Sequence, residues 1–387
     1  MRLASLGLLV LVGCAPPALK LPNGATCTTT SSAGADAASL RDALSRATAG
    51  TCVVATAAKY QGEFSVPAGV VLGAEPGATV AFTGAQASTP TLTLGSGSTL
   101  TGLSITNAPG IGVLGAPGVQ LLDVKVDGAL AAGLVFWCEE DCRTAGPAAL
   151  QGVELTGNAV GLVVHGSTVN VTGGKVTGSK STAIASGYGV VVSAGAVFQM
   201  TDTVVENNEE VGMLVDGALD TSASLLQVKL QNNRGRGLWA QGLLGSSSST
   251  RLQLSGCVVE GNKLVGVGTR ASRGVRIDGG RMSGTLLGQA MSAAGTLVNV
   301  GDGLGLFEGT GDVLVDGATL ENNTRSQVLV DSGALGLSVQ NSTVNAGTAQ
   351  GVVVQRTTQA VTAPMIFVPP AGQELPFSAP TLALPTR

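Results

Sequence analysis

The chain repeats one arrangement of hydrophobic and polar positions along most of its length. Each copy has an apolar residue, a polar residue, a turn rich in Asn and Gly, and then a Gly followed by alternating aliphatic residues. Residues 204–208 (Val-Val-Glu-Asn-Asn) lead in this way to 212–215 (Gly-Met-Leu-Val), and residues 229–233 (Lys-Leu-Gln-Asn-Asn) lead to 237–239 (Gly-Leu-Trp). Such internal similarity is typical of repeat architectures.

The apolar residue before each turn marks the repeat. It recurs at Ile105, Val126, Leu155, Val176, Val205, Leu230, Val259, Met282, Leu320 and Val344. The intervals are 21 to 29 residues, except for one of 38 residues between Met282 and Leu320. Coils of this length predict an all-β solenoid of short parallel strands, in which each coil pairs with its neighbours at a spacing of about 4.8 Å.

Asn at the turn has a physical explanation. It tolerates the left-handed backbone conformation that a tight turn requires. Its side-chain amide can also bond the Asn of the next coil. We therefore expect the turn asparagines to link successive coils.

Residues 36–47 predict an amphipathic helix at the start of the solenoid. Leu40, Ala43, Leu44 and Ala47 share one face, and Asp36 is a suitable N-cap. An open solenoid end exposes unpaired backbone, so we expect this helix to cap it.

Alternation after each Gly assigns a direction to every side chain. Residues one and three positions after the Gly, such as Leu134 and Phe136, should point inward. The residues two positions after it should face outward and are mostly apolar: Leu114, Val135, Val163, Val191, Leu214, Trp239, Gly268, Ala290, Leu329 and Val353. An apolar outward column is unusual in water. We expect inserted loops or the C-terminal tail to cover it; the alternative is a docking surface for a second copy or a long partner.

A polar column lies two residues further on in each coil. It reads Ala116, Trp137, His165, Ser193, Asp216, Gln241, Arg270, Ser292, Asp331 and Gln355. The simpler interpretation, which we favour, is a solvated face. The alternative is a shallow groove for a polysaccharide or another envelope protein, lined by Trp137, His165, Asp216, Arg236, Trp239, Gln241 and Arg270.

The N-terminus resembles a bacterial lipoprotein signal. Arg2 precedes a short apolar run, residues 6–12, which is too short to span a bilayer and ends before Gly13 and Cys14. The resemblance implies that residues 1–13 are removed and that lipid on Cys14 anchors the chain to a membrane. Residues 14–33 would be the tether, and Ala15 after the cysteine favours the outer membrane. The alternative is an ordinary secretory signal with an incidental cysteine.

The remaining cysteines fit an oxidising compartment. Cys27 and Cys52 flank the predicted helix, and Cys138 and Cys142 could close a small loop. Cys257 should face inward as an unreactive thiol. With one His in the chain, we expect neither a zinc site nor any other metal or cofactor.

Composition narrows the class of protein. The chain has 387 residues, of which 57 are Gly, 44% are hydrophobic and 12% are charged. So much Gly suits strands with tight turns rather than helices. The net charge of −4 offers no basic face, so we exclude nucleic acid as a partner.

The first coils carry a family resemblance. Residues 50–54, 60–64 and 66–73 are similar to the opening of pectin-lyase-like right-handed β-helix repeat proteins. The resemblance implies a right-handed parallel β-helix over 34–360 and says little about activity. Residues 361–387, with six prolines and no repeat, are expected to drape over the last coil or hang free.

The catalytic segments of β-helix polysaccharide lyases, hydrolases and epimerases do not occur in the sequence. Unfamiliar acid–base pairs would have to come from the carboxylates Glu206, Glu209, Glu210, Asp302, Glu308, Asp312 and Asp316. Two Trp and two Tyr leave few aromatic platforms for sugars. We therefore rank an exported, noncatalytic scaffold or binding protein first, and a polysaccharide lyase, hydrolase or epimerase with an atypical site second.

Overall fold

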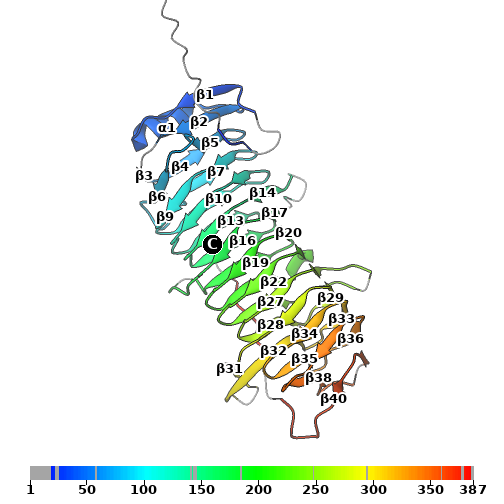
Figure 1. Ribbon diagram of the computed structural model, residues 1–387. Coiled ribbons are helices and arrows are strands. Elements are labelled where there is room, and N and C mark those ends of the chain that lie inside the picture. Colours follow the sequence, from blue (N-terminus) through cyan, green and yellow to red (C-terminus); the bar gives the residue numbers. More distant parts are fainter. Residues whose placement is uncertain are drawn as a thin grey trace, which may run out of the picture.

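The computed structural model describes residues 19–21, 26–56, 59–139, 142, 146–183, 185–246, 248–292, 295–358, 360–375 and 379–384. The predicted signal segment and Cys14 lie outside these residues. No helix within the described residues is long and apolar enough to cross a membrane. The described chain winds into one elongated solenoid, with α1 and β1 at one end and β40 at the other (Figure 1).

Three sheets run the length of the solenoid, and all strands within each stack are parallel neighbours. The first sheet contains β1 (Thr29–Ser32), β2 (Thr51–Ala55), β5 (Val71–Ala74), β8 (Thr99–Thr101), β11 (Gln120–Leu122), β14 (Ala148–Gln151), β17 (Thr168–Thr172), β20 (Val197–Thr201), β23 (Ser222–Leu226), β26 (Leu252–Ser255), β29 (Arg273–Asp278), β33 (Gly311–Asp316), β36 (Leu337–Gln340) and β39 (Val361–Thr362).

The second sheet carries the outward columns predicted from the sequence. It contains β4 (Phe64–Val66), β7 (Leu92–Leu94), β10 (Ile111–Gly115), β13 (Ala132–Trp137), β16 (Val160–His165), β19 (Tyr188–Ser193), β22 (Val211–Asp216), β25 (Arg236–Gln241), β28 (Leu264–Arg270), β32 (Leu297–Phe307), β35 (Ser326–Val330), β38 (Gln350–Val354) and β40 (Ile366–Phe367). A further strand, β31 (Gly288–Met291), pairs with β32 alone.

The third sheet has the shortest strands. It contains β3 (Lys59–Gln61), β6 (Ala81–Thr83), β9 (Ser104–Thr106), β12 (Lys125–Asp127), β15 (Glu154–Thr156), β18 (Lys175–Thr177), β21 (Val204–Glu206), β24 (Lys229–Gln231), β27 (Val258–Glu260), β30 (Arg281–Ser283), β34 (Thr319–Glu321) and β37 (Thr343–Asn345). Each coil visits the first, third and second sheets in that order, so the prediction of an all-β, right-handed parallel β-helix is confirmed.

The core is the continuous interior of the solenoid. Inward side chains from all three sheets form one apolar cluster that extends from Ala33 to Val352. Leu134 and Phe136, predicted to point inward, are both buried in it. Cys257 is also buried there as a free thiol, and burial raises its pKa.

The two asparagines of each Asn-Asn pair have different roles. The first adopts the left-handed conformation, with φ of 55° at both Asn207 and Asn232. The second is buried and bonds the next coil: Asn208 Nδ2 donates to Asn233 Oδ1 at 2.9 Å, and Asn233 Nδ2 donates to Asn262 Oδ1 at 2.8 Å. Both expectations for the turn asparagines are therefore confirmed.

The Gly that recurs after each turn leaves room for this ladder. A Cβ atom on Gly212 would lie 2.6 Å from Asn233 Nδ2, and one on Gly237 would lie 2.8 Å from Asn262 Nδ2. A Cβ on Gly237 would also lie 2.5 Å from the carbonyl oxygen of Gly266. The repeated Gly and the repeated Asn are thus two parts of one packing arrangement.

The N-terminal end of the solenoid is capped as predicted. Helix α1 (Ala37–Arg46) begins after Asp36, whose carboxylate accepts hydrogen bonds at 2.9 Å from the backbone N–H groups of Ala38 and Ser39. Leu40 and Leu44 are buried against the first coils. A disulfide joins Cys27 to Cys52 in β2, and a second joins Cys138 to Cys142.

One coil was aligned wrongly from the sequence. Ala290 and Ser292 do not continue the outward columns, because β31 and the start of β32 form an inserted antiparallel hairpin. Gly305 and Phe307 take the two positions, opposite Gly268 and Arg270. The Gly at 288 is followed by residues that resemble a repeat, and the interval of 38 residues was the sign of an insertion.

Candidate functional site

The outward residues of the second sheet form two aligned columns, which together we call the outer face. In the apolar column Val135, Val163, Val191, Leu214 and Trp239 pair with one another from coil to coil. In the polar column Trp137, His165 and Ser193 are aligned, and Asp216, Gln241 and Arg270 continue the alignment. Val192 pairs with Val215, so Ser193 and Asp216, which follow them, lie side by side and the two groups form one column.

The C-terminal tail covers part of the outer face, between the last coils and the coil of β25. The tail follows β40, and the structure describes it at 368–375 and 379–384. Its residues Leu375, Ala379 and Leu382 belong to a second apolar cluster with the outward column. Ala185, Ala290 and Val298 from inserted segments join the same cluster. The expectation that loops and the tail cover the apolar column is therefore confirmed for the described residues.

Glutamine side chains attach the tail to the polar column. Gln355 Oε1 accepts from the backbone N–H of Leu375 at 2.8 Å, and its Nε2 donates to the Leu375 carbonyl at 2.9 Å. Gln241 holds Leu382 in the same way, at 2.9 and 3.0 Å. Between them, Arg270 donates to the hydroxyl of Thr381. The tail thus runs from the last coils back to the coil of β25.

Two rings are stacked at the other end of the polar column. The centroids of Trp137 and His165 lie 3.8 Å apart with an angle of 8° between the ring planes. Both side chains are partly exposed, and His165 Nδ1 lies 3.1 Å from Ser193 Oγ. Burial lowers the pKa of His165, and the negative charge of Glu139 opposes this effect. The imidazole therefore favours its neutral form.

Trp239 and Arg236 do not line an open groove, contrary to the prediction. Trp239 is fully buried: its ring lies against Gly268, where a Cβ would come within 2.3 Å, and Phe307 stacks on it at 6.0 Å. Arg236 is 8% exposed, with its guanidinium carbon 4.9 Å from the Trp239 ring centroid. The physical reason is that the tail and inserted residues cover this part of the apolar column.

Burial also shifts the charged groups around Arg236. Desolvation lowers the pKa of Arg236 to about 10, although Glu210 and Tyr188 favour its charged form. Desolvation raises the pKa of Glu210, an effect that the charge of Arg236 opposes. The Nε of Arg236 has no hydrogen-bond partner within the described residues. This cluster is a buried part of the outer face rather than its binding surface.

The carboxylates considered from the sequence are mostly engaged by neighbours. Asp216 accepts from Gln241 at 2.8 Å, and Glu308 accepts from Arg270 at 2.8 Å. Asp302 is fully buried and pairs with Arg325 and with Ser326. Such pairing favours structural roles for these groups. Within the described residues there is no group of three or more His, Cys, Asp or Glu that could hold a metal ion.

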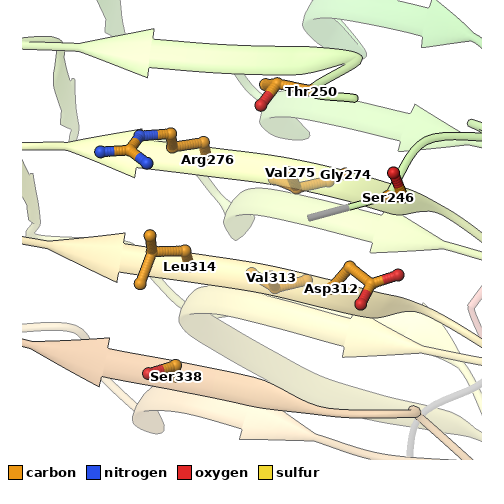
Figure 2. Close-up of a pocket in the computed structure, with 9 residues that line it drawn as sticks. All are labelled: Ser246, Thr250, Gly274, Val275, Arg276, Asp312, Val313, Leu314 and Ser338. Atoms are coloured by element: carbon orange, nitrogen blue, oxygen red, sulfur yellow. The ribbon is translucent and has the colours of Figure 1, made fainter. Parts of the chain in front are cut away.

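A shallow hollow of about 270 Å³ lies on a different face, over β29, β33 and β36 of the first sheet. Figure 2 shows Arg276 and Asp312 pointing in opposite directions along this sheet, so their charges do not converge. Arg276 instead pairs with Asp278 at 2.7 Å, and this pairing raises its pKa. The hollow therefore has no converging pair of charged groups, and the outer face of the second sheet is the better candidate for a functional site.

No protein-family model matches the chain, and no curated protein matches it in sequence. The A-module of the mannuronan C-5 epimerase AlgE4 from Azotobacter vinelandii aligns with a TM-score of 0.51 and 13% identity, over 87% of this chain and 98% of that one. A polygalacturonase from Erwinia carotovora ssp. carotovora aligns with a TM-score of 0.38 and 12% identity, over 92% of this chain and 99% of that one. The chain thus has the fold of pectin-lyase-like β-helix proteins.

Proposed function

We propose that the protein is an exported binding protein that holds a polysaccharide on the outer face of the second sheet without cleaving it. The stacked pair Trp137–His165 is the observation that carries this proposal. It lies beyond Gln241, the last polar-column residue that the described tail contacts. The described tail residues therefore do not reach this partly exposed pair, which supports it as the contact for a ligand.

The chemistry of this end suits a sugar. An aromatic ring offers an apolar face and a polar edge, and a pyranose ring combines apolar C–H faces with hydroxyl groups. His165 stacks on one face of Trp137. In the preceding coil the residue aligned with Trp137 is Ala116, because Gly115 pairs with Phe136, so that neighbour has only a small side chain. Ser193 follows in the polar column but is buried, and its Oγ lies 3.1 Å from His165 Nδ1, so it positions the imidazole and does not face a ligand. Asp216, next along the column, is partly exposed, and its oxygen that does not accept from Gln241 is the one that could accept from a hydroxyl.

The state of the carboxylates supports binding rather than catalysis. General acid–base chemistry needs two groups that are free to exchange protons at the substrate. Asp216 is engaged by Gln241, and Glu308 is engaged by Arg270. The name of the epimerase neighbour gives mannuronan as its substrate, so acidic polysaccharides are the first ligands to test.

Lipid attachment at Cys14 is the second part of the proposal. The apolar run 6–12 and the Gly-Cys pair that follows support it, as does the export implied by two disulfides. The test is expression of the full chain and of Cys14→Ala in a lipoprotein-processing bacterium with radiolabelled fatty acid. We expect label and outer-membrane fractionation for the full chain and neither for the variant. Label in both would contradict attachment at Cys14.

Binding is tested with residues 15–387, which keep every described strand and both disulfides, on a panel of acidic and neutral polysaccharides. Retention in affinity electrophoresis is expected for at least one glycan. Trp137→Ala should reduce it about tenfold or more, because a stacked aromatic contributes about 1–3 kcal/mol in comparable contacts. The control is Leu244→Ala, an exposed side chain whose backbone pairs with Arg273 at the start of β29 in the first sheet.

Chain length and uronate stereochemistry of each glycan are measured after the same incubation. Retention without change supports the proposal. Cleavage, a new unsaturated sugar end or epimerisation would contradict it and favour a lyase, hydrolase or epimerase. Retention that Trp137→Ala leaves intact would contradict the site while preserving the function.

A further inference from the structure

Two aromatic rings lie along the covered part of the outer face. Trp239 and Phe307 stack with their centroids 6.0 Å apart and an angle of 28° between the ring planes. A Cβ on Gly268, a residue of the apolar column, would come within 2.3 Å of the Trp239 ring. In the next coil, a Cβ on Gly305 would come within 2.5 Å of the Phe307 ring. The two Gly residues therefore make room for a floor of aromatic rings on the sheet.

Two buried donor groups at this aromatic floor have no hydrogen-bond partner within the described residues. They are Nε1 of Trp239 and Nε of Arg236. The guanidinium carbon of Arg236 lies 4.9 Å from the centroid of the Trp239 ring, and only 8% of Arg236 is exposed. Buried donors are normally paired, because burial removes their hydrogen bonds to water. Both groups are therefore able to donate to a ligand that carries acceptors.

Arg236 differs in its ion pairing from other arginines at this sheet. Arg270 pairs with Glu308, and Arg325 pairs with Asp302. Arg236 takes part in no ion pair with any residue that the structure describes. The charge of Glu210 acts on it, but burial raises the pKa of that carboxyl and so weakens its compensation of the guanidinium. A buried guanidinium without a paired carboxylate suits an anionic group of a ligand.

The segment that conceals these groups, residues 379–384, is held by few contacts. Gln241, two residues beyond Trp239 in β25, bonds the backbone of Leu382. Ala379 and Leu382 add apolar contacts to the outward column. The segment belongs to no helix or strand, so its release breaks no pairing between strands. The aromatic floor can therefore be uncovered while the solenoid stays folded.

We propose that the part of the outer face around Trp239 and Arg236 is a second sugar site, which an acidic polysaccharide occupies in place of residues 379–384. With the tail in place the site is buried, and the ligand and the tail exclude each other. The apolar side of a sugar lies on the aromatic floor, and its carboxylate accepts hydrogen bonds from Arg236.

This second site rests on the proposed function, because the same glycan chain continues to it from the Trp137–His165 pair. Four coil steps separate the coil of Trp137 from that of Trp239, about 19 Å at the usual strand spacing. A ligand that reaches both places is therefore a chain of several sugars. A short oligomer would contact only one of them.

The first test compares residues 15–387 with residues 15–375 by calorimetric titration. The probes are mannuronan oligomers and the same oligomers with their carboxylates reduced to alcohols. Removal of the tail should tighten binding of the acidic oligomer about tenfold, as expected if the tail is in place about nine-tenths of the time. The reduced oligomer should gain less, because it offers Arg236 no charge.

Substitution of Arg236 in the shortened chain separates its charge from the aromatic floor. Arg236→Gln should remove the difference between the acidic and the reduced oligomer, and Arg236→Lys should keep part of it. Circular dichroism establishes that each variant keeps the β-helix. An equal gain for both oligomers on tail removal would overturn the proposal, and so would a preference for the acidic oligomer that Arg236→Gln leaves intact.

The second test uses residues 15–387 with the tail intact, so it needs no variant. Addition of the acidic oligomer should accelerate hydrogen exchange at the Leu382 amide, which the ligand displaces from Gln241. The Leu375 amide is the control, because Gln355 holds it in the same way four coils away. Bound oligomer with unchanged exchange at Leu382 would overturn the second site and leave the proposed function standing. If neither form binds either oligomer, the second site is overturned, whereas the proposed function is judged by the wider glycan panel.

Discussion

Gln241 holds Leu382 by two hydrogen bonds, although 141 residues separate them in the chain. Each bond contributes about 0.5–1.5 kcal/mol net, so the end of the tail is attached by a small local free energy. Gln241→Leu should therefore release residues 379–384 while leaving the solenoid folded. Hydrogen exchange should accelerate at the Leu382 amide, with little change in the strands.

Gln340→Leu is the matched control for that prediction. Gln340 is an exposed glutamine of β36 whose side chain donates to Ser338 Oγ at 2.9 Å, away from the tail. Its replacement should leave the Leu382 amide unchanged. Equal hydrogen exchange at Leu382 in both variants would show that the two hydrogen bonds of Gln241 do not retain the tail.

Removal of the tail should expose Trp239, which is fully buried beneath the covered part of the outer face. In a Trp137→Phe background, Trp239 is the sole tryptophan, because the chain has two. Truncation after Val368 should shift its fluorescence to longer wavelength and make it accessible to acrylamide. In a Trp239→Phe background, the same truncation should leave the emission of Trp137 nearly constant. Unchanged Trp239 emission would mean that the strands and inserted hairpin bury it without the tail.

His165 is the single histidine of the chain, so its titration can be followed without assignment. Because burial penalises the imidazolium more than Glu139 stabilises it, the pKa should lie below the ordinary value of 6.5. The contribution of the neutral His165 ring to the free energy of unfolding is therefore fully present above about pH 6.5, and it is lost as the pH falls through the folded-state pKa. Proton NMR of the imidazole measures the midpoint, and Glu139→Gln should lower it further. A midpoint above 6.5 would contradict this account of the Trp137–His165 stack.

The regular part of the molecule could be predicted from the sequence because it obeys local rules. A buried Asn at the position of Asn208 recurs in several coils, at Asn158, Asn233, Asn262 and Asn323, and a Gly such as Gly212 follows the turn in most of them. Both indicate a turn geometry that successive coils share. The burial of Trp239 and the contact of Arg270 with the tail could not be predicted in this way. Leu382, which belongs to the same apolar cluster as Trp239, and Thr381, which accepts from Arg270, lie in a segment without periodicity, and only the folded chain brings them to these residues. The columns were predicted wrongly at Ala290 and Ser292 because Gly288, at the start of the hairpin strand β31, is followed by residues that resemble those of a coil.

The Asn ladder should make a measurable contribution to stability. Asn233→Ala removes the acceptor of Asn208 Nδ2 and the donor to Asn262 Oδ1. Each buried polar group left without a partner costs about 1–3 kcal/mol, so the midpoint of urea unfolding should fall clearly. The neighbouring variant Asn232→Gly is the control, because Gly adopts the left-handed conformation of that position readily. A similar loss in both variants would assign the effect to the turn rather than to the ladder.

Gly237→Ala tests whether the recurrent Gly exists to accommodate the ladder. Its Cβ would lie 2.5 Å from the carbonyl oxygen of Gly266 and 2.8 Å from Asn262 Nδ2, and the first of these is backbone that cannot rotate away. Overpacking of this kind costs about 1–3 kcal/mol or more, and the loss should appear in the free energy of unfolding. Gly309→Ala is the control, because Gly309 has a φ of 74° and open space around its Cβ position, so that it reports left-handed strain alone, about 1–2 kcal/mol. If Gly237→Ala costs less than Gly309→Ala, the packing of Gly against the neighbouring coil does not limit the repeat, and turn geometry alone explains its periodicity.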